Sequence, residues 1–378
     1  MKFTTLVETL KKAVNSAEKI TGRNLTLPVL SNILFKTNTN KLHLFATDLE
    51  IGIELVITGK TETEGKFVVP AKTFAEFLNN LSEETISLEE KNETLVIKSG
   101  KYHTVFQGFN PEEFPIIPEA KTDKYLEIEK AYLIEALEQI LPSVGYNSPK
   151  PELNGVLFKL ESSGDKSVLK LVGTDSFRLA EKTIVSSQIK TNIKNDTELI
   201  IPLRTTQEVL RLMQENIENE SSTVKITPEP NQVQFSFSNI RLISRLINAD
   251  YPKYVSIIPK EFENKVILNR RELIEAVRII GLFSGKVNDV KFNFNPSKKE
   301  ITLEAQDPSL GKSQTILTPL EMSGNSLEIS FNYRFLLDGL NSAKGEEVFI
   351  GLNKESNPGL IKEKQDDNFV YILMPIKL

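Results

Sequence analysis

The sequence predicts three tandem α+β domains, each with two helices packed on antiparallel strands. A polar turn carrying an aspartate recurs at Asp48, Asp175 and Asp307, at intervals of 127 and 132 residues. Around the first two aspartates apolar and polar residues alternate, which is typical of a strand that turns and pairs with its continuation. A helical pattern also occurs three times, at 10–14, 133–137 and 273–277. Repeats of this length indicate domains rather than the units of a solenoid.

Composition limits the class of protein. A chain of 378 residues, 39% hydrophobic and 26% charged, suits two or three domains, and no apolar run approaches the roughly 18 residues that span a bilayer. We therefore expect a soluble, globular protein, and the absence of cysteine fits a cytoplasmic one. The chain has no cysteine, which excludes disulfides and thiolate chemistry, and its net charge of −5 argues against a protein that simply coats nucleic acid. Its two histidines, His43 and His103, lie in strand-like patterns, which argues against a histidine-based catalytic or metal centre.

Each repeat contains two helical patterns and several strand patterns, separated by proline-rich segments. The expected domains are residues 1–124, 125–262 and 263–378. The expected helices are 5–20, 71–81, 128–141, 205–215, 270–283 and 332–343. The clearest strands are 85–89, 94–98, 102–106, 153–160, 168–172, 290–295, 301–305 and 327–331. Open sheet edges invite uncontrolled pairing, so domains of this kind are well suited to joining edge to edge in a closed ring.

Short motifs along the whole chain carry a family resemblance. They are Thr26-Leu-Pro-Val-Leu-Ser-Asn-Ile, Ala46-Thr-Asp-Leu-Glu, Val69-Pro-Ala-Lys-Thr-Phe, Phe114-Pro, Leu153-Asn-Gly-Val, Thr174-Asp-Ser-Phe-Arg-Leu-Ala180, Tyr251-Pro and Met374-Pro-Ile-Lys-Leu378. In this order they closely resemble the bacterial DNA polymerase III beta subunit family, the replication sliding clamps. The resemblance implies a head-to-tail homodimer that closes into a six-domain ring, with sheets outside and twelve helices around a hole for double-stranded DNA.

The same resemblance implies a protein with no catalytic activity and no cofactor. Members of the family tether the replicative DNA polymerase to its template and bind the clamp loader and other replication and repair proteins. These partners insert a short peptide, typically with a glutamine and a leucine-phenylalanine end, into a cleft between the second and third domains. Matched by motif, the cleft residues here are Leu153, Thr174, Ser176, Phe177, Arg178, Leu179, Pro252, Ile257, Asn332, Phe335, Ile372, Leu373, Met374, Pro375 and Ile376.

Two further sets of residues follow from the resemblance. The expected DNA-facing residues are cations on the lining helices and nearby turns: Lys11, Lys12, Arg23, Lys72, Lys150, Arg204, Arg211, Arg271 and Arg334. Because acids share these helices, their field should be modest, which suits weak, sequence-independent contact with phosphates. The expected dimer interface joins a strand of the first domain to the end of a helix in the third, through Thr104, Phe106, Arg278, Leu282 and Phe283.

Two other functions compete with the clamp. An enzyme is disfavoured because Leu310-Gly-Lys-Ser313 has Gln306 where a phosphate-binding loop needs glycine, and because the repeat places the recurring aspartates in separate domains. A ring or arc that gathers proteins without binding DNA stays open as an alternative. Retention on circular DNA, followed by release when that DNA is cut, separates a clamp from such a scaffold.

Overall fold

The chain forms two compact units. The computed structural model describes residues 1–22, 27–163, 166–215 and 222–377. One unit comprises Met1–Lys130 with Arg211–Leu246, and the other Ala131–Leu210 with Ile247–Leu378. The described residues include the helices α1 (Val7–Glu18), α2 (Ala71–Asn79), α3 (Lys130–Ile140), α4 (Leu203–Glu215), α5 (Arg270–Gly281) and α6 (Tyr333–Ser342).

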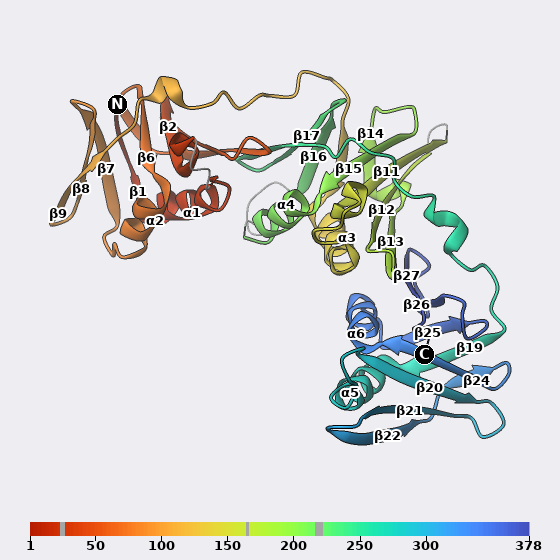
Figure 1. The fold of residues 1–378 in the computed structure, drawn as a ribbon. Helices are drawn as coiled ribbons and strands as arrows, with labels where there is room; N and C mark the ends of the chain where they lie inside the picture. Colours follow the sequence, from red (N-terminus) through yellow and green to blue (C-terminus); the bar gives the residue numbers. More distant parts are fainter. Residues whose placement is uncertain (23–26, 164–165, 216–221, 378) are drawn as a thin grey trace. The chain divides into compact units, whose positions relative to one another are not determined.

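The first unit contains two antiparallel sheets (Figure 1). One has the strand order β5 (Lys60–Thr63), β1 (Lys2–Leu6), β7 (Thr85–Lys91), β8 (Thr94–Ser99) and β9 (Tyr102–Gln107). The other contains, in order, β10 (Leu126–Glu129), β16 (Thr223–Pro228), β17 (Gln232–Phe237), β18 (Ile240–Arg245), β4 (Ile51–Thr58), β3 (Lys41–Thr47), β2 (Asn32–Asn38) and β6 (Gly65–Pro70). The pairing of β18 with β4 therefore continues a sheet of the second repeat into the first.

Helices α1 and α2 pack against each other and against strands of this unit (Figure 1). In α1 the apolar residues Leu10, Val14 and Ala17 recur at helical spacing, and all three are fully buried. The helix begins at Val7 rather than at residue 5, because Lys2–Leu6 is a strand that pairs with β7. That strand was not expected, since its alternation covers only five residues before the helical period begins.

The second unit has the same construction. Its larger sheet has the order β15 (Thr197–Pro202), β11 (Gly155–Ser163), β12 (Lys166–Thr174), β13 (Arg178–Ile184), β27 (Phe369–Leu373), β26 (Gly359–Glu363), β25 (Glu347–Leu352), β19 (Asn264–Asn269) and β23 (Glu321–Ser323). Its smaller sheet has the order β22 (Gly311–Leu317), β21 (Glu300–Asp307), β20 (Asp289–Asn295) and β24 (Leu327–Asn332). The remaining strand is β14 (Ile189–Thr191).

Helices α5 and α6 pack closely in the third domain, and Gly281 permits the approach. A Cβ on Gly281 would lie 2.5 Å from the ring of Tyr333, the first residue of α6. Asn332 begins α6 by accepting hydrogen bonds from the backbone N–H groups of Arg334 and Phe335, at 3.0 and 3.4 Å. This packing fixes the start of α6 beside strand β20, which pairs with β24.

The fold class expected from the sequence is confirmed, with three tandem domains of mixed helix and antiparallel sheet. Each expected helix overlaps one of α1 to α6, with ends that differ by at most two residues. Several short strands were not expected, among them β5, β10, β19, β22 and β23. No helix among the described residues is long and apolar enough to cross a membrane.

Candidate peptide-binding cleft

The turn between β12 and β13 presents Phe177 to solvent. Asp175 Oδ1 accepts hydrogen bonds from the backbone N–H groups of Phe177 and Arg178, at 2.9 and 3.0 Å. The hydroxyl of Thr174 donates to the carbonyl oxygen of Arg178 at 2.6 Å. Ser176 takes a left-handed conformation with φ 78°, which the surrounding hydrogen bonds hold in place. The turn is therefore rigid, and the ring of Phe177 is 62% exposed at its tip.

The C-terminal strand brings the tail to this turn. Strand β27 pairs antiparallel with β13, so Leu179 lies opposite Ile372 and Arg178 opposite Leu373. Beyond the strand, the backbone N–H of Met374 donates to the carbonyl oxygen of Phe177 at 2.9 Å. The thioether side chain of Met374 is 38% exposed. A flexible, exposed methionine next to an exposed ring suits a surface that accepts several related ligands.

Leu179 and Ile372 form a buried apolar floor together with Tyr254. The hydroxyl of Tyr254 donates to Glu181 Oε2 at 2.6 Å, and that of Tyr251 to the carbonyl oxygen of Val172 at 3.2 Å. Burial, and for Tyr254 also the Glu181 carboxylate, raises the pKa of both hydroxyls, so they remain neutral donors. The two tyrosines therefore fix the segment that joins the second and third domains over the sheet.

Arg178 links the turn to helix α6. Its guanidinium lies 4.2 Å from the ring centroid of Phe335 and is paired with both Asp175 and Asp338. Burial opposes this charge, but Tyr371 and the two carboxylates outweigh burial and raise the pKa of Arg178. Phe177 stacks on Phe335, with ring centroids 6.5 Å apart. The exposed ring of Phe177 and the guanidinium of Arg178 therefore both pack on Phe335.

The structure brings together much of the expected cleft. Phe177, Arg178, Phe335 and Met374 surround one surface, and Leu179 and Ile372 lie beneath it. Leu373 points to the opposite face of its strand and packs in the third domain with Phe331 and Leu336. The other expected members are placed as follows: Leu153 is buried in the turn Pro151–Asn154, Pro252 and Ile257 are exposed in the connecting segment, and Pro375 and Ile376 are half-buried in the tail.

Three residues of this region were absent from the expected set. Tyr251 belongs to a motif that the sequence displays, but nothing in it distinguishes a supporting residue from a contact residue. Tyr254 and Asp338 make their contacts across long sequence separations, with Glu181 and Arg178 respectively. Because only the folded sheet and helix bring these pairs together, no local signal could have identified them.

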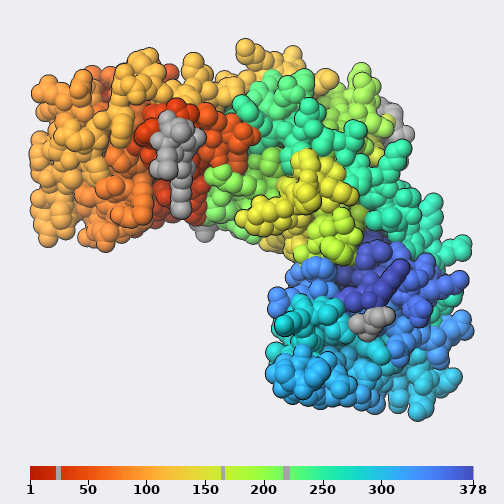
Figure 2. Space-filling view, viewed as in Figure 1, coloured from red at the N-terminus to blue at the C-terminus, as the bar shows by residue number. Residues whose placement is uncertain are grey.

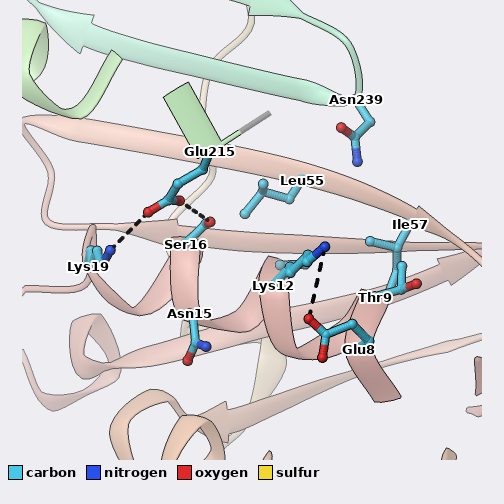
Figure 3. Close-up of a pocket in the computed structure, with 11 residues that line it drawn as sticks. Glu8, Thr9, Lys12, Asn15, Ser16, Lys19, Leu55, Ile57, Glu215 and Asn239 are labelled. Atoms are coloured by element: carbon cyan, nitrogen blue, oxygen red, sulfur yellow. Dashed lines mark hydrogen bonds and ion pairs between the residues drawn. The ribbon is translucent and has the colours of Figure 1, made fainter. Parts of the chain in front are cut away.

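The expected DNA-facing cations of the first unit are partly neutralised by acids. Glu215, at the end of α4, accepts from Lys19 at 3.2 Å and from the Ser16 hydroxyl at 3.3 Å (Figure 3). It also accepts from Arg211, on the same helix, at 2.6 Å. Burial alone would raise the pKa of Glu215, but the two cations outweigh burial and lower it. Lys12 lies 4.0 Å from Glu8 on the same helix (Figure 3). The positive field of this surface is therefore modest.

The other expected cations occupy helices and turns of both units. Lys11 donates to the carbonyl oxygen of Asn79, Arg271 pairs with Glu275 at 3.1 Å, and Arg334 lies over the ring of Tyr333. Lys72, Lys150 and Arg204 are exposed. Arg23 lies outside the described residues. No group of three His, Cys, Asp or Glu residues within the described part of the chain is arranged to hold a metal ion.

The expected interface residues lie at a strand edge and a helix end. Thr104 and Phe106 are on β9, the last strand of its sheet, and the ring of Phe106 packs 5.3 Å from Phe74. The outward face of β9 instead carries Val105, which is 51% exposed. In the third domain, Arg278 lies in the last turn of α5 and Phe283 just beyond it, with Leu282 exposed between them.

Comparisons with known proteins cover the chain from end to end. Family models of the DNA polymerase III beta subunit match in order: the N-terminal domain at residues 1–118, the central domain at 127–253 and the C-terminal domain at 255–377. The beta sliding clamp of Bacillus subtilis is 27% identical over 390 residues, covering 100% of both chains. A crystal structure of the Bacillus subtilis sliding clamp superposes with a TM-score of 0.91 at 26% identity, covering 100% of this chain and 99% of that one. The Pseudomonas aeruginosa beta subunit, 24% identical over 100% of both chains, has the same fold with a TM-score of 0.92.

Proposed function

This chain belongs to the DNA polymerase III beta subunit family, and we propose that it acts as a replication sliding clamp. In this role it is a non-catalytic accessory subunit that encircles duplex DNA, slides without sequence preference and tethers the polymerase. The observation that carries the proposal is the match of all three family domains, in order, over nearly the whole chain. We therefore propose that the protein acts in the cytoplasm.

Encirclement requires a closed ring, and we assign it to a head-to-tail homodimer. Strand β9 ends a sheet of the first unit and β22 ends a sheet of the second. Each exposes an apolar side chain on its outward-facing positions, Val105 on β9 and Ile316 on β22, at 51% and 56%. Paired edge to edge between two chains, these strands would cover both edges, and Leu282 with Phe283 would lie at the same contact.

We propose domain boundaries at 124/125 and 262/263. The first boundary falls between the N-terminal and central family models, which end and begin at residues 118 and 127. The second lies nine residues beyond the central model, which ends at residue 253, and inside the C-terminal model, which begins at residue 255. It precedes strand β19, the first strand of the third domain. The connecting segments then contain Phe114–Pro118 and Tyr251–Pro259.

The cations on the helices support weak contact with DNA. Pairing with Glu215, Glu8 and Glu275 lowers the net field, so each phosphate contact contributes little. A ring holds its DNA by enclosure, and weak contacts allow the chain to move along the duplex. Lys11, Lys12, Arg23, Lys72, Lys150, Arg204, Arg211, Arg271 and Arg334 are the residues proposed to face the DNA.

The cleft at the second and third domains is proposed to bind partner peptides. Its apolar floor accepts a leucine or phenylalanine side chain, while the exposed Met374 adapts to the sequence of the partner. Polymerase, clamp loader and repair proteins with a glutamine and a leucine-phenylalanine end would compete for this surface. The tail is therefore expected to be essential for partner binding.

Two assays test the function. Fluorescence anisotropy of a labelled Gln-Leu-x-Leu-Phe peptide should show saturable binding to the native chain and none to a chain ending at Leu373, with equal circular dichroism spectra. The second assay loads the chain onto nicked circular DNA with a clamp loader and ATP, and then cuts the circle. A clamp is retained before the cut and lost after it. Retention that survives cutting would contradict encirclement, and no retention at all would favour a scaffold that does not bind DNA.

A further inference from the structure

The turn at Asp48 repeats the turn of the candidate cleft almost atom for atom. Asp48 Oδ1 accepts hydrogen bonds from the backbone N–H groups of Glu50 and Ile51 at 2.9 and 2.8 Å, as Asp175 does from the equivalent residues of its own turn. The Thr47 hydroxyl donates to the carbonyl oxygen of Ile51 at 2.8 Å. Leu49 has φ 77°, where Ser176 has φ 78°. The first unit therefore contains a second copy of this hydrogen-bonded turn.

The strand beside the turn is also repeated. In the first unit β18 pairs with β4, so that Gly52 lies opposite Ile243 in the way that Leu179 lies opposite Ile372. Beyond this pair, the backbone N–H of Arg245 donates to the carbonyl oxygen of Glu50 at 3.0 Å. The same bond joins Met374 to Phe177 in the cleft. By this equivalence Arg245 takes the place of Met374, and Glu50 takes the place of Phe177.

The segment joining the first and second domains lies over this pair, as Tyr251–Ile258 lies over the other. A Cβ on Gly52 would lie 2.9 Å from Ile117 and 3.3 Å from Ile243, so Ile117 occupies the space that a side chain would fill. The neighbouring Ile116 is 95% exposed, and the segment runs on the surface of the molecule in orange-yellow (Figures 1 and 2). What remains is a groove of about 260 Å³, lined by Leu49, Ile51, Pro115, Ile117, Ile243 and Arg245 among others.

We propose that this groove is a second, weaker docking site for partner peptides, selective for an acidic residue beside an apolar anchor. The proposal rests on the proposed function, because it takes its ligand class from the peptide cleft. A groove smaller than the roughly 300–1,000 Å³ typical of whole ligands accommodates one anchoring side chain. Glycine at position 52 removes the leucine that forms the floor of the main cleft, which also lowers the affinity.

Charge gives the groove its preference. Arg245 is 67% exposed and contacts Glu50 only at 3.5 Å, with Glu50 66% exposed in turn. An exposed pair of this kind contributes little, so a peptide carboxylate can replace Glu50 as the partner of the guanidinium. The equivalent position in the main cleft has the uncharged Met374. An acidic peptide therefore gains an interaction in the groove that the position of Met374 does not provide.

The test uses the full chain and two peptides, Gln-Leu-Asp-Leu-Phe and Gln-Leu-Lys-Leu-Phe. Calorimetry and methyl NMR follow binding, with the methyl groups of Ile117 and Ile243 reporting the groove and that of Met374 the cleft. Both peptides should saturate the cleft. At higher concentration the Asp peptide alone should shift the Ile117 and Ile243 signals, as a second class of about one site per chain.

Two variants should change the affinity of this second class of sites in opposite directions. Arg245→Glu should weaken it about fivefold or more, and Glu50→Gln should strengthen it about twofold, the range typical of exposed charge pairs. Neither variant should change peptide binding at the cleft. If Ile117 and Ile243 stay unshifted at saturating Asp peptide while Met374 responds, the second site does not exist and the clamp function stands. If the signals of neither region shift, the assignment of the peptide cleft is contradicted as well. A second class that both variants leave unchanged would place that binding elsewhere and overturn the proposal.

Discussion

Arg178 lies with its guanidinium 4.2 Å from the ring of Phe335 while it pairs with Asp338, three residues further along the same helix. Only 12% of the Arg178 side chain and 17% of Asp175 are exposed, so the pair between these two is largely desolvated, whereas Asp338 is 41% exposed. One side chain from the second domain therefore makes both a stacking and an ionic contact with the third. Removing only one partner of a buried ion pair costs more free energy than the intact pair contributes, because the other charge is left buried and unpaired.

Removing this cation should destabilise the second unit. Arg178→Ala leaves Asp175 and part of Asp338 unpaired, and should lower the free energy of unfolding by about 3 kcal/mol. Arg178→Lys keeps the charge but loses the planar stacking on Phe335, so about half of that loss is expected. Urea unfolding followed by circular dichroism measures both. Arg271→Ala, which breaks a pair on an 89% exposed arginine, is the matched control and should cost less than about 1 kcal/mol. Equal losses at the two positions would contradict the structure.

The ring of Phe177 should matter for binding and not for folding. It is 62% exposed and its stacking partner is Phe335, so Phe177→Ala should change the free energy of unfolding by less than about 1 kcal/mol. The same change removes an aromatic contact from the peptide surface and should weaken peptide binding about tenfold. Peptide anisotropy and urea unfolding of the same preparation separate the two effects. Phe109→Ala, at an exposed ring of the first domain, should leave the affinity unchanged.

The acid dependence of stability should include a contribution from Glu54. Burial raises its pKa, but His43 Nδ1 at 2.8 Å and Arg241 Nη2 at 2.5 Å outweigh burial, and the net pKa is lowered. A carboxyl whose folded pKa is lowered stabilises the fold above its unfolded value of about 4.3, and that contribution is lost as pH falls through the folded pKa. Glu54→Gln should therefore reduce stability at pH 7 and flatten its decline between about pH 5 and pH 3. Urea midpoints across that range measure the slope. Glu119→Gln, a variant of an exposed partner of the same arginine, should keep the native slope.

Local patterns were enough to predict the helices, whereas the strands depended on context. The six helical patterns bury apolar faces, as Leu10 and Leu273 do, and a period of 3.6 residues is readable in the sequence. Strand β22 was not expected because Gly311–Leu317 has polar residues at most positions and is a strand by pairing with β21. The cleft was predicted by motif, while Tyr254 and Asp338 become visible only when β13 and α6 are placed.

Glu215 should control how strongly the first unit contacts DNA. Its carboxylate is paired with both Lys19 and Arg211. Glu215→Gln removes that negative charge and leaves the hydrogen-bonding shape of the side chain, so both cations become available to phosphates. Each added phosphate contact should steepen the dependence of log K on log salt by about 0.9, and sliding should slow at low salt. Single-molecule diffusion on end-blocked DNA at several salt concentrations measures this. Glu198→Gln, which affects a pair with the partly buried Lys159 on a strand, is the control. Unchanged diffusion in Glu215→Gln would mean that this surface does not face DNA.

The edges of β9 and β22 should decide the oligomeric state. Antiparallel pairing between chains uses the backbone N–H groups of both end strands, and proline removes one such donor and blocks the approach of a partner strand. In β22, Thr315 pairs with Leu303 and Gln314 with Glu304, so adjacent residues direct their N–H groups to opposite sides. Thr315→Pro and Gln314→Pro therefore form a matched pair. The outward variant is the one whose lost N–H points away from β21. The other variant removes an N–H that points toward β21, and so disturbs the sheet itself. The outward variant should shift the mass from a dimer toward the single-chain value of 42.6 kDa with little change in unfolding. Sedimentation equilibrium gives the mass. If the outward variant remains a dimer, β22 is not the interface between the two chains.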